Sequence, residues 1–272
     1  MDLIFFDLDG TLLNKDSVIS AYTKETLKLL HQRNIAYTVA TGRTMLSAHK
    51  LIAEHNFALP HIYNNGVAVW DPTVKALTLE SLLNDNEVNI VIDCANEYGI
   101  TPFVNTVSDH AHCIFHGPTQ HQVERDLIDK YFSKTDALLF PLTSLASGAK
   151  ITNISMIGEA KTIREMWRYL NSLDSLVAYS GPAVEGQNFS WMDVHHRLAS
   201  KGNAVQNLKR KLGATNIICF GDSDNDASMF ELADECYAPD NAKPAIKTLA
   251  SDVIEHHDKD GVARFLRERF SL

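Results

Sequence analysis

Two patterns of apolar and polar residues divide the chain. Short apolar runs at residues 3–7, 35–40 and 216–220 are typical of strands that are covered on both faces. Segments with apolar residues at helical spacing separate such runs, and strands that alternate with helices indicate a mostly parallel α/β sheet. Helices are expected at residues 45–56, 203–212 and 227–232, with an earlier one capped by Asp16 or Ser17. Two further strand and helix units are expected to finish the chain.

The pattern changes in the middle of the chain. A hairpin is expected around Asp71-Pro72, and pairs of strands mixed with helices follow after Ser81. The expected helices are at 84–98, 120–132 and 160–172, and the expected strands at 102–107, 112–115, 151–157, 176–179 and 189–194. We therefore predict an α/β core made of residues 1–81 and 194–272, with an α+β domain inserted at residues 82–193.

Composition narrows the class of protein. The 272 residues are 45% apolar and carry a formal net charge of −9, which does not favour a nucleic-acid binder, because such proteins need basic patches. No apolar run is long enough to span a membrane, and no signal peptide is apparent. We expect a small-molecule substrate, no nucleic-acid or membrane partner, and a monomer or weak homodimer.

The cysteines indicate the redox compartment. They stand far apart and include no CxxC pair, so we expect reduced thiols in a cytoplasmic protein, not a disulfide framework or a zinc site. The four are Cys94, Cys113, Cys219 and Cys236.

Polar clusters follow strand ends or open helices at four places. They are DLDGT at 7–11, TGR at 41–43, KGN at 201–203 and GDSDND at 221–226. Because ligands of open α/β sheets bind beyond the carboxyl ends of the strands, we expect these four clusters to converge in one crevice. Gly10 and Gly42 would let backbone N–H groups approach an anion closely there.

The side chains in these clusters suit phosphate chemistry with a hard cation. Asp7, Asp9 and Asp222 offer oxygen ligands without a soft partner, which suits Mg²⁺. Thr41 offers a hydroxyl donor and Lys201 a positive charge that suits phosphate. Asp7 ends its strand and is the better placed nucleophile, whereas Asp9 could donate and accept a proton.

Two other metal sites are conceivable and less favoured. A calcium loop at GDSDND is disfavoured, because the DxDxDG spacing is missing and Ala233 stands where a bidentate Glu would be needed. Four histidines crowd one part of the insertion and could hold a metal, but solvated or substrate-contacting side chains are the preferred interpretation. They are His110, His112, His116 and His121.

The four motifs, in this order, resemble those of the haloacid dehalogenase superfamily, in its Cof-type phosphatase branch. The inserted domain resembles the C2B cap of that branch, so the resemblance covers essentially the whole chain and implies a Rossmann-like core. The stretch YAPDNA at residues 237–242 departs from the more apolar sequence usual in relatives, which leaves its local packing open.

The resemblance also implies residue roles. Asp7 would accept the phosphoryl group and Asp9 would be the general acid/base, with Mg²⁺ held by Asp7, Asp222 and the Asp9 backbone carbonyl. The implied phosphate-binding residues are Leu8, Thr41, Gly42, Lys201 and Asn225. The implied supporting or substrate-contacting residues are Arg43, Asn65 and Asp226.

These features predict a Mg²⁺-dependent phosphatase of small phosphorylated metabolites that acts through an aspartyl phosphate. Sugar phosphates or pyridoxal-phosphate-like monophosphates are the expected substrates, because the insertion carries 14 acidic and 7 basic residues and its negative charge disfavours more anionic ligands. Among enzymes, the alternative is a phosphomutase or phosphotransferase. A dehalogenase is disfavoured, because it has little use for the acid at Asp9, two residues after the nucleophile. Among proteins without catalytic activity, the alternative is a sugar-phosphate sensor or a receiver-like module.

Overall fold

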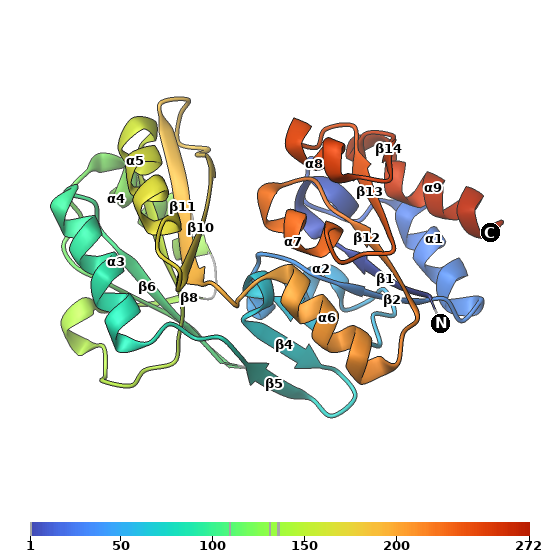
Figure 1. Cartoon of the computed structure of the whole chain (residues 1–272), viewed down its shortest axis with the longest axis horizontal. Helices are drawn as coiled ribbons and strands as arrows, with labels where there is room; N and C mark the ends of the chain where they lie inside the picture. The colour runs from blue at the N-terminus through green and yellow to red at the C-terminus, as the bar shows by residue number, and fades with distance from the viewer. Residues whose placement is uncertain (1, 109, 131, 135–136) are drawn as a thin grey trace. The chain divides into compact units, whose positions relative to one another are not determined.

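The chain folds into two compact units. The computed structural model describes residues 2–108, 110–130, 132–134 and 137–272. The first unit combines Met1–Thr78 with Ser200–Leu272, and the second is Leu79–Ala199 (Figure 1). The chain leaves the first unit once and returns to it once, so the sequence of the first unit is interrupted.

A five-stranded parallel sheet forms the centre of the first unit. Its order is β14-β13-β12-β1-β2, with every neighbouring pair parallel. The strands are β1 (Asp2–Phe6), β2 (Ala36–Val39), β12 (Asn216–Phe220), β13 (Glu235–Pro239) and β14 (Asp252–Ile254). The expected α/β core with a mostly parallel sheet is confirmed.

Helices cover both faces of this sheet because its strands are apolar on both. Leu3 and Phe5 of β1 pack in one cluster with Val205 and Leu208, which lie on α6. On the other face, Phe220 contacts the ring of Phe265, which lies on α9. The helices of the unit are α1 (Ala21–Gln32), α2 (Met45–Ile52), α6 (Lys201–Leu212), α7 (Ala227–Phe230), α8 (Pro244–Leu249) and α9 (Gly261–Phe270).

The first unit also contains the expected hairpin. It forms a small sheet of β3 (His61–Tyr63), β4 (Ala68–Asp71) and β5 (Ala76–Leu79). A parallel bridge between Ala40 and Ile62 joins the start of this sheet to the end of β2. Asn64 and Asn65 follow β3 with left-handed backbone angles, which asparagine tolerates better than most residues.

Helix starts in the first unit correct two expectations. Ser20 caps α1, because its Oγ accepts from the Thr23 N–H at 3.0 Å, so neither Asp16 nor Ser17 is the cap. Ser200 caps α6, so this helix begins at Lys201, two residues earlier than expected. Lys201 is therefore in the first turn of a helix instead of the loop before it.

The second unit is a six-stranded sheet of order β10-β11-β9-β6-β7-β8. Its strands are β6 (Phe103–Val107), β7 (His112–His116), β8 (Ala137–Pro141), β9 (Ile151–Glu159), β10 (Leu176–Pro182) and β11 (Phe189–His196). Its helices are α3 (Asp85–Glu97), α4 (Gln122–Lys130) and α5 (Ala160–Asn171). The helix expected at 120–132 includes residue 131, which lies outside the described residues.

Apolar packing holds α3 and α5 on one face of this sheet. Val91 of α3 and Ile163 of α5 share a buried cluster with Val104, Ile154 and Met192 of the strands. These three lie on β6, β9 and β11, which are interior strands of the sheet. The insertion therefore has the α+β character expected from its sequence.

Candidate active site

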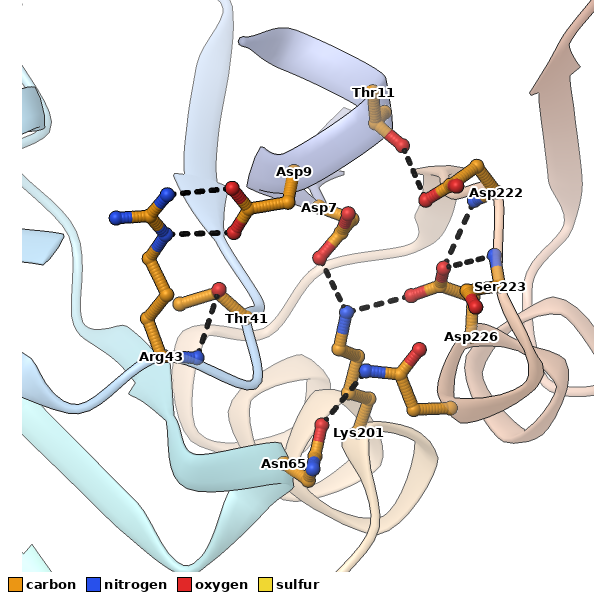
Figure 2. Close-up of polar contacts among 11 residues, drawn as sticks. Asp7, Asp9, Thr11, Thr41, Arg43, Asn65, Lys201, Asp222, Ser223 and Asp226 are labelled. Atoms are coloured by element: carbon orange, nitrogen blue, oxygen red, sulfur yellow. Dashed lines mark hydrogen bonds and ion pairs between the residues drawn. The ribbon is translucent and has the colours of Figure 1, made fainter. Parts of the chain in front are cut away.

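Lys201 lies between two carboxylates in the first unit (Figure 2). Its Nζ donates to Asp7 Oδ1 at 2.5 Å and to Asp226 Oδ1 at 2.6 Å. Asp7 directly follows β1, and its backbone N–H continues the sheet by donating to the Phe220 carbonyl at 2.9 Å. The three charged side chains come from distant parts of the chain, and the parallel sheet brings them together.

Burial sets the charge state of this group. Lys201 is fully buried, and burial lowers the pKa of its ammonium, but Asp226 and Asp7 more than offset this and hold the pKa above its usual value. Burial raises the pKa of Asp7 well above its ordinary value, with Asp226 and Asp222 adding to the shift and Lys201 opposing it. The cluster therefore holds one ammonium against an excess of carboxylates.

Asp222 completes the acidic cluster. It lies two residues after the end of β12, and its Oδ1 accepts from the Thr11 hydroxyl at 3.4 Å. Burial raises the pKa of Asp222 to about 6, and the charge of Asp226 adds to this shift. A Cβ atom on Gly10, whose φ is +76°, would lie 2.6 Å from Asp222 Oδ2, so only glycine fits beside this carboxylate.

Asp226 holds the loop that carries Asp222. Its Oδ2 accepts from the backbone N–H groups of Asp222 and Ser223, both at 2.9 Å, while its Oδ1 is occupied by Lys201. Asp226 is fully buried. Both of its oxygens thus accept hydrogen bonds from neighbouring groups.

The cluster fits a hard divalent cation. Asp7, Asp222 and Asp226 each place one carboxylate oxygen within 4.8 Å of the other two, and Asp7 and Asp222 are the better candidate ligands because both Asp226 oxygens already accept hydrogen bonds. Burial raises the pKa values of Asp7 and Asp222, and the repulsion of the neighbouring carboxylates adds to both shifts. An all-oxygen donor set that is short of positive charge suits Mg²⁺.

The Asp9 side chain lies outside this acidic cluster. It forms a fork with Arg43, in which Nε donates to Oδ2 at 2.6 Å and the terminal nitrogen donates to Oδ1 at 2.5 Å (Figure 2). Asp9 is 52% exposed and Arg43 26% exposed at their side chains. The sequence did not predict this pair, because the two residues are 34 positions apart and no local pattern links them.

Three further residues that the sequence predicted to bind phosphate lie around the end of β2. Thr41 is buried, and its hydroxyl oxygen accepts from the Arg43 N–H at 3.1 Å. Asn225 Nδ2 donates to Asn65 Oδ1 at 2.9 Å. A Cβ on Gly42 would lie 3.2 Å from that Asn65 oxygen, so Gly42 adjoins the amide pair. Leu8, the fifth predicted phosphate residue, is a buried part of the turn after Asp7.

One residue of this region was missed by the sequence reasoning. Asn241, in the stretch that departs from relatives, donates from Nδ2 to the Gly10 carbonyl at 2.7 Å. Its only signal was a side-chain amide shortly after a strand, which is common in turns. The structure thus gives a definite contact to a stretch whose packing the sequence left open.

The histidines of the second unit make separate contacts. His112 Nε2 donates to Asn105 Oδ1 at 2.8 Å, His116 Nδ1 to the Gly117 carbonyl and His121 Nε2 to the Gly99 carbonyl. In the part of the chain that the structure describes, these histidines do not form a metal-ligating group.

The chain belongs to the haloacid dehalogenase-like hydrolases, because the model of that family matches residues 4–266. The expected membership is confirmed, and the enzyme class of the family is hydrolase. Across the described ranges no helix is both long and apolar enough to cross a bilayer.

Two phosphatases and one solved hydrolase structure resemble the chain over nearly its whole length. It is 26% identical to a 5-amino-6-(5-phospho-D-ribitylamino)uracil phosphatase of Bacillus subtilis, over 99% of this chain and 98% of that protein. It is 25% identical to a pyridoxal phosphate phosphatase of Escherichia coli, over 97% of both chains. A solved haloacid dehalogenase-like hydrolase of B. subtilis matches with a TM-score of 0.81 at 22% identity, over 98% of this chain and 99% of that one.

Proposed function

We propose that this hydrolase is a Mg²⁺-dependent phosphatase of small phosphorylated metabolites. The observation that carries the proposal is the buried cluster of Asp7, Lys201, Asp226 and Asp222 at the ends of β1 and β12. It supplies a nucleophile, a fixed positive charge and oxygen ligands in one place. The phosphatase names of the two relatives support the same reaction.

Asp7 is the proposed nucleophile. One of its oxygens attacks phosphorus in line while the bond from phosphorus to the leaving oxygen breaks, which yields an aspartyl phosphate and an alcohol. Lys201, fixed at 2.5 Å from Asp7 by its second bond to Asp226, keeps a positive charge beside the transferred group. This charge stabilises the negative charge that the phosphoryl oxygens carry during transfer.

Asp9 is the proposed general acid and base. In the first step it gives a proton to the leaving oxygen, and in the second it takes a proton from the water that attacks the aspartyl phosphate. That attack releases inorganic phosphate and restores the Asp7 carboxylate. In the structure Arg43 holds both oxygens of the Asp9 carboxylate, so Asp9 has to leave this fork before it gives or takes a proton.

Neutral groups would bind the phosphoryl oxygens. Thr41, Gly42 and Asn225 supply a hydroxyl, a backbone N–H and an amide close to the Asn65 amide.

Asp7 and Asp222, with the Asp9 carbonyl, would hold Mg²⁺, which supplies further positive charge to the phosphoryl group when bound. Asp226 would orient Asp222 through the two backbone N–H groups that it accepts from.

The second unit is the proposed cap domain that selects the rest of the substrate. The relatives are named for a phosphorylated ribitylaminouracil and for pyridoxal phosphate, both monophosphates whose remaining parts are polar. We propose the same class of substrate here: a monophosphate on a hydroxylated or heteroaromatic group.

A phosphate-release screen of such monophosphates tests the proposal. We expect turnover with Mg²⁺, none with EDTA, recovery when Mg²⁺ is restored and poor substitution by Ca²⁺, which prefers more ligands at longer distance. D7N should abolish turnover, because an amide is a poor nucleophile of nearly the same shape. D224N, at an exposed aspartate of the same loop, is the matched control and should keep activity.

Three results would contradict the proposal. They are full phosphate release by D7N, full release by metal-free protein, and phosphoryl transfer to a sugar hydroxyl in place of water. The last would identify a phosphotransferase of the same family.

A further inference from the structure

The segment after β13 contacts both chain segments that carry the acidic cluster. Asn241 Nδ2 donates to the Gly10 carbonyl at 2.7 Å, and Asn241 Oδ1 accepts from the His257 backbone N–H at 3.1 Å. His257 in turn donates from Nδ1 to the Leu13 carbonyl at 2.7 Å. The Asn241 amide thus bridges the turn after Asp7 and the loop before α9.

The same segment holds the backbone of Asp222. The Lys243 N–H donates to the Asp222 carbonyl at 2.9 Å, two residues after Asn241. Gly10, the acceptor of Asn241, is also the residue that lies against the Asp222 carboxylate, since a Cβ there would come within 2.6 Å of Oδ2. Residues 241–243 therefore fix the backbone at Gly10 and at Asp222. These are the two segments that carry the proposed cation ligands.

A cation site is sensitive to such supports. Mg²⁺ requires near-octahedral geometry with short distances to oxygen, so small displacements of a ligand weaken its binding. Groups that orient the ligands without touching the metal typically contribute about 10- to 100-fold to metal affinity or activity. Asn241 is placed to act in this way, because it contacts the carbonyl of Gly10 and no carboxylate of the cluster in any recorded hydrogen bond.

We infer that Asn241 is a positioning residue for the Mg²⁺ site, an inference that rests on the proposed function. The role needs a donor toward Gly10 and an acceptor toward His257, and the planar amide supplies both from one short side chain. Aspartate keeps the acceptor but turns an oxygen toward the Gly10 carbonyl. Leucine, of similar size, supplies neither group.

The test is Mg²⁺ binding without substrate, measured by titration calorimetry on the whole chain. We expect N241D and N241L to bind Mg²⁺ about 10- to 100-fold more weakly than the wild type. The added charge of N241D would by itself attract Mg²⁺, so a loss in both variants comes from lost positioning and not from charge. D240N, a change at the exposed neighbour, is the control and should bind within twofold of the wild type.

Two further readouts separate positioning from a purely structural role. The melting temperature of each metal-free variant reports folding, and its rise with Mg²⁺ concentration reports binding to the folded state. We expect a reduced rise with Mg²⁺ and partial recovery of phosphatase activity at high Mg²⁺. If either N241D or N241L does not fold, the Mg²⁺ affinity of the other variant tests the inference.

The outcomes distinguish this inference from the proposed function. Variants that melt lower but bind Mg²⁺ within twofold of the wild type overturn the positioning role and leave the phosphatase proposal intact. A wild type that neither binds Mg²⁺ nor releases phosphate overturns the proposed function, and the role of Asn241 with it.

Discussion

Lys201 illustrates how a buried charge depends on its neighbours. The sequence suggested a phosphate-binding lysine, and the structure places its ammonium on two carboxylates with no exposed surface. Taking these charges out of water is costly, and their mutual attraction offsets the cost only while all partners are present. The residue is therefore expected to matter for stability as well as for catalysis.

K201M tests this expectation. Removing one partner of a buried ion pair typically costs about 3–5 kcal/mol, because the remaining charge stays buried without compensation. Asp7 and Asp226 would be left facing an apolar side chain, and turnover should be lost. Denaturant unfolding in metal-free buffer measures the cost.

The cost should depend on pH with a definite sign. Lys201 lowers the pKa of Asp7, so its loss raises that pKa further above the value in the unfolded chain. A carboxyl with a raised folded pKa destabilises the fold when ionised and stops doing so once protonated. The stability difference between wild type and K201M should therefore shrink as the pH falls through the raised pKa of Asp7. A difference that stays constant or grows would contradict this account.

Thr41 gives a milder prediction. T41V keeps the shape but removes the hydroxyl, and loss of one donor to a transition state typically costs on the order of 10²–10³ in rate. The turnover number should fall by that amount with the melting temperature little changed. T248V, at an exposed threonine on α8, should behave like the wild type. A loss smaller than about tenfold would place Thr41 outside the contacts of the phosphoryl group.

At the scale of elements, apolar patterning predicted the buried strands well and the exposed one poorly. β1 and β12 are continuous apolar runs, and both were predicted within one residue. β8 was missed although it contains three large apolar residues; it is a mostly exposed strand at the edge of its sheet, beside β7. Its Leu138 is 52% exposed. Burial on both faces leaves a continuous apolar run, whereas the apolar run of β8 is not accompanied by burial.

The start of α6 depends on close packing that the sequence did not reveal. A Cβ on Gly202 would lie 2.2 Å from the Ser228 backbone carbonyl oxygen, so any larger residue must move the helix or the loop. Overpacking of this kind typically costs about 1–3 kcal/mol. Because Lys201 is the preceding residue, the shift also displaces its ammonium.

G202A is thus expected to lower both stability and turnover. Unfolding in denaturant and phosphate release under saturating Mg²⁺ measure the two effects. The control is G117A, where the added methyl meets no atom within 4 Å. If G202A and G117A have equal stability and equal turnover, the start of α6 accommodates the methyl group without displacing Lys201.

At the scale of the whole molecule, strand order turned four separate motifs into one expected site. The motifs at residues 7–11, 41–43, 201–203 and 221–226 could be placed together because parallel strands end at the same edge of a sheet. Contacts that depend on side-chain direction could not be predicted: the Asp9–Arg43 fork and the Asn241 bridge join residues without any periodic relation. The sequence thus indicated which residues gather, and the structure added which atoms meet.

Charge distribution over the whole chain gives the last prediction. Residues 82–193 carry 14 acidic and 7 basic side chains, a net of −7, whereas the rest of the chain carries 20 and 18, a net of −2. If this insertion selects the part of the substrate beyond the phosphate, its negative field opposes a second anionic group, and more strongly at low salt. A hexose monophosphate should therefore have a higher kcat/KM than its bisphosphate, with a ratio that falls as salt rises. Steady-state kinetics at two salt concentrations measure this ratio, with a monophosphate of an uncharged aryl group as the control for general salt effects. A bisphosphate that is consistently preferred, at a ratio independent of salt, would show that the charge of the insertion does not govern selection.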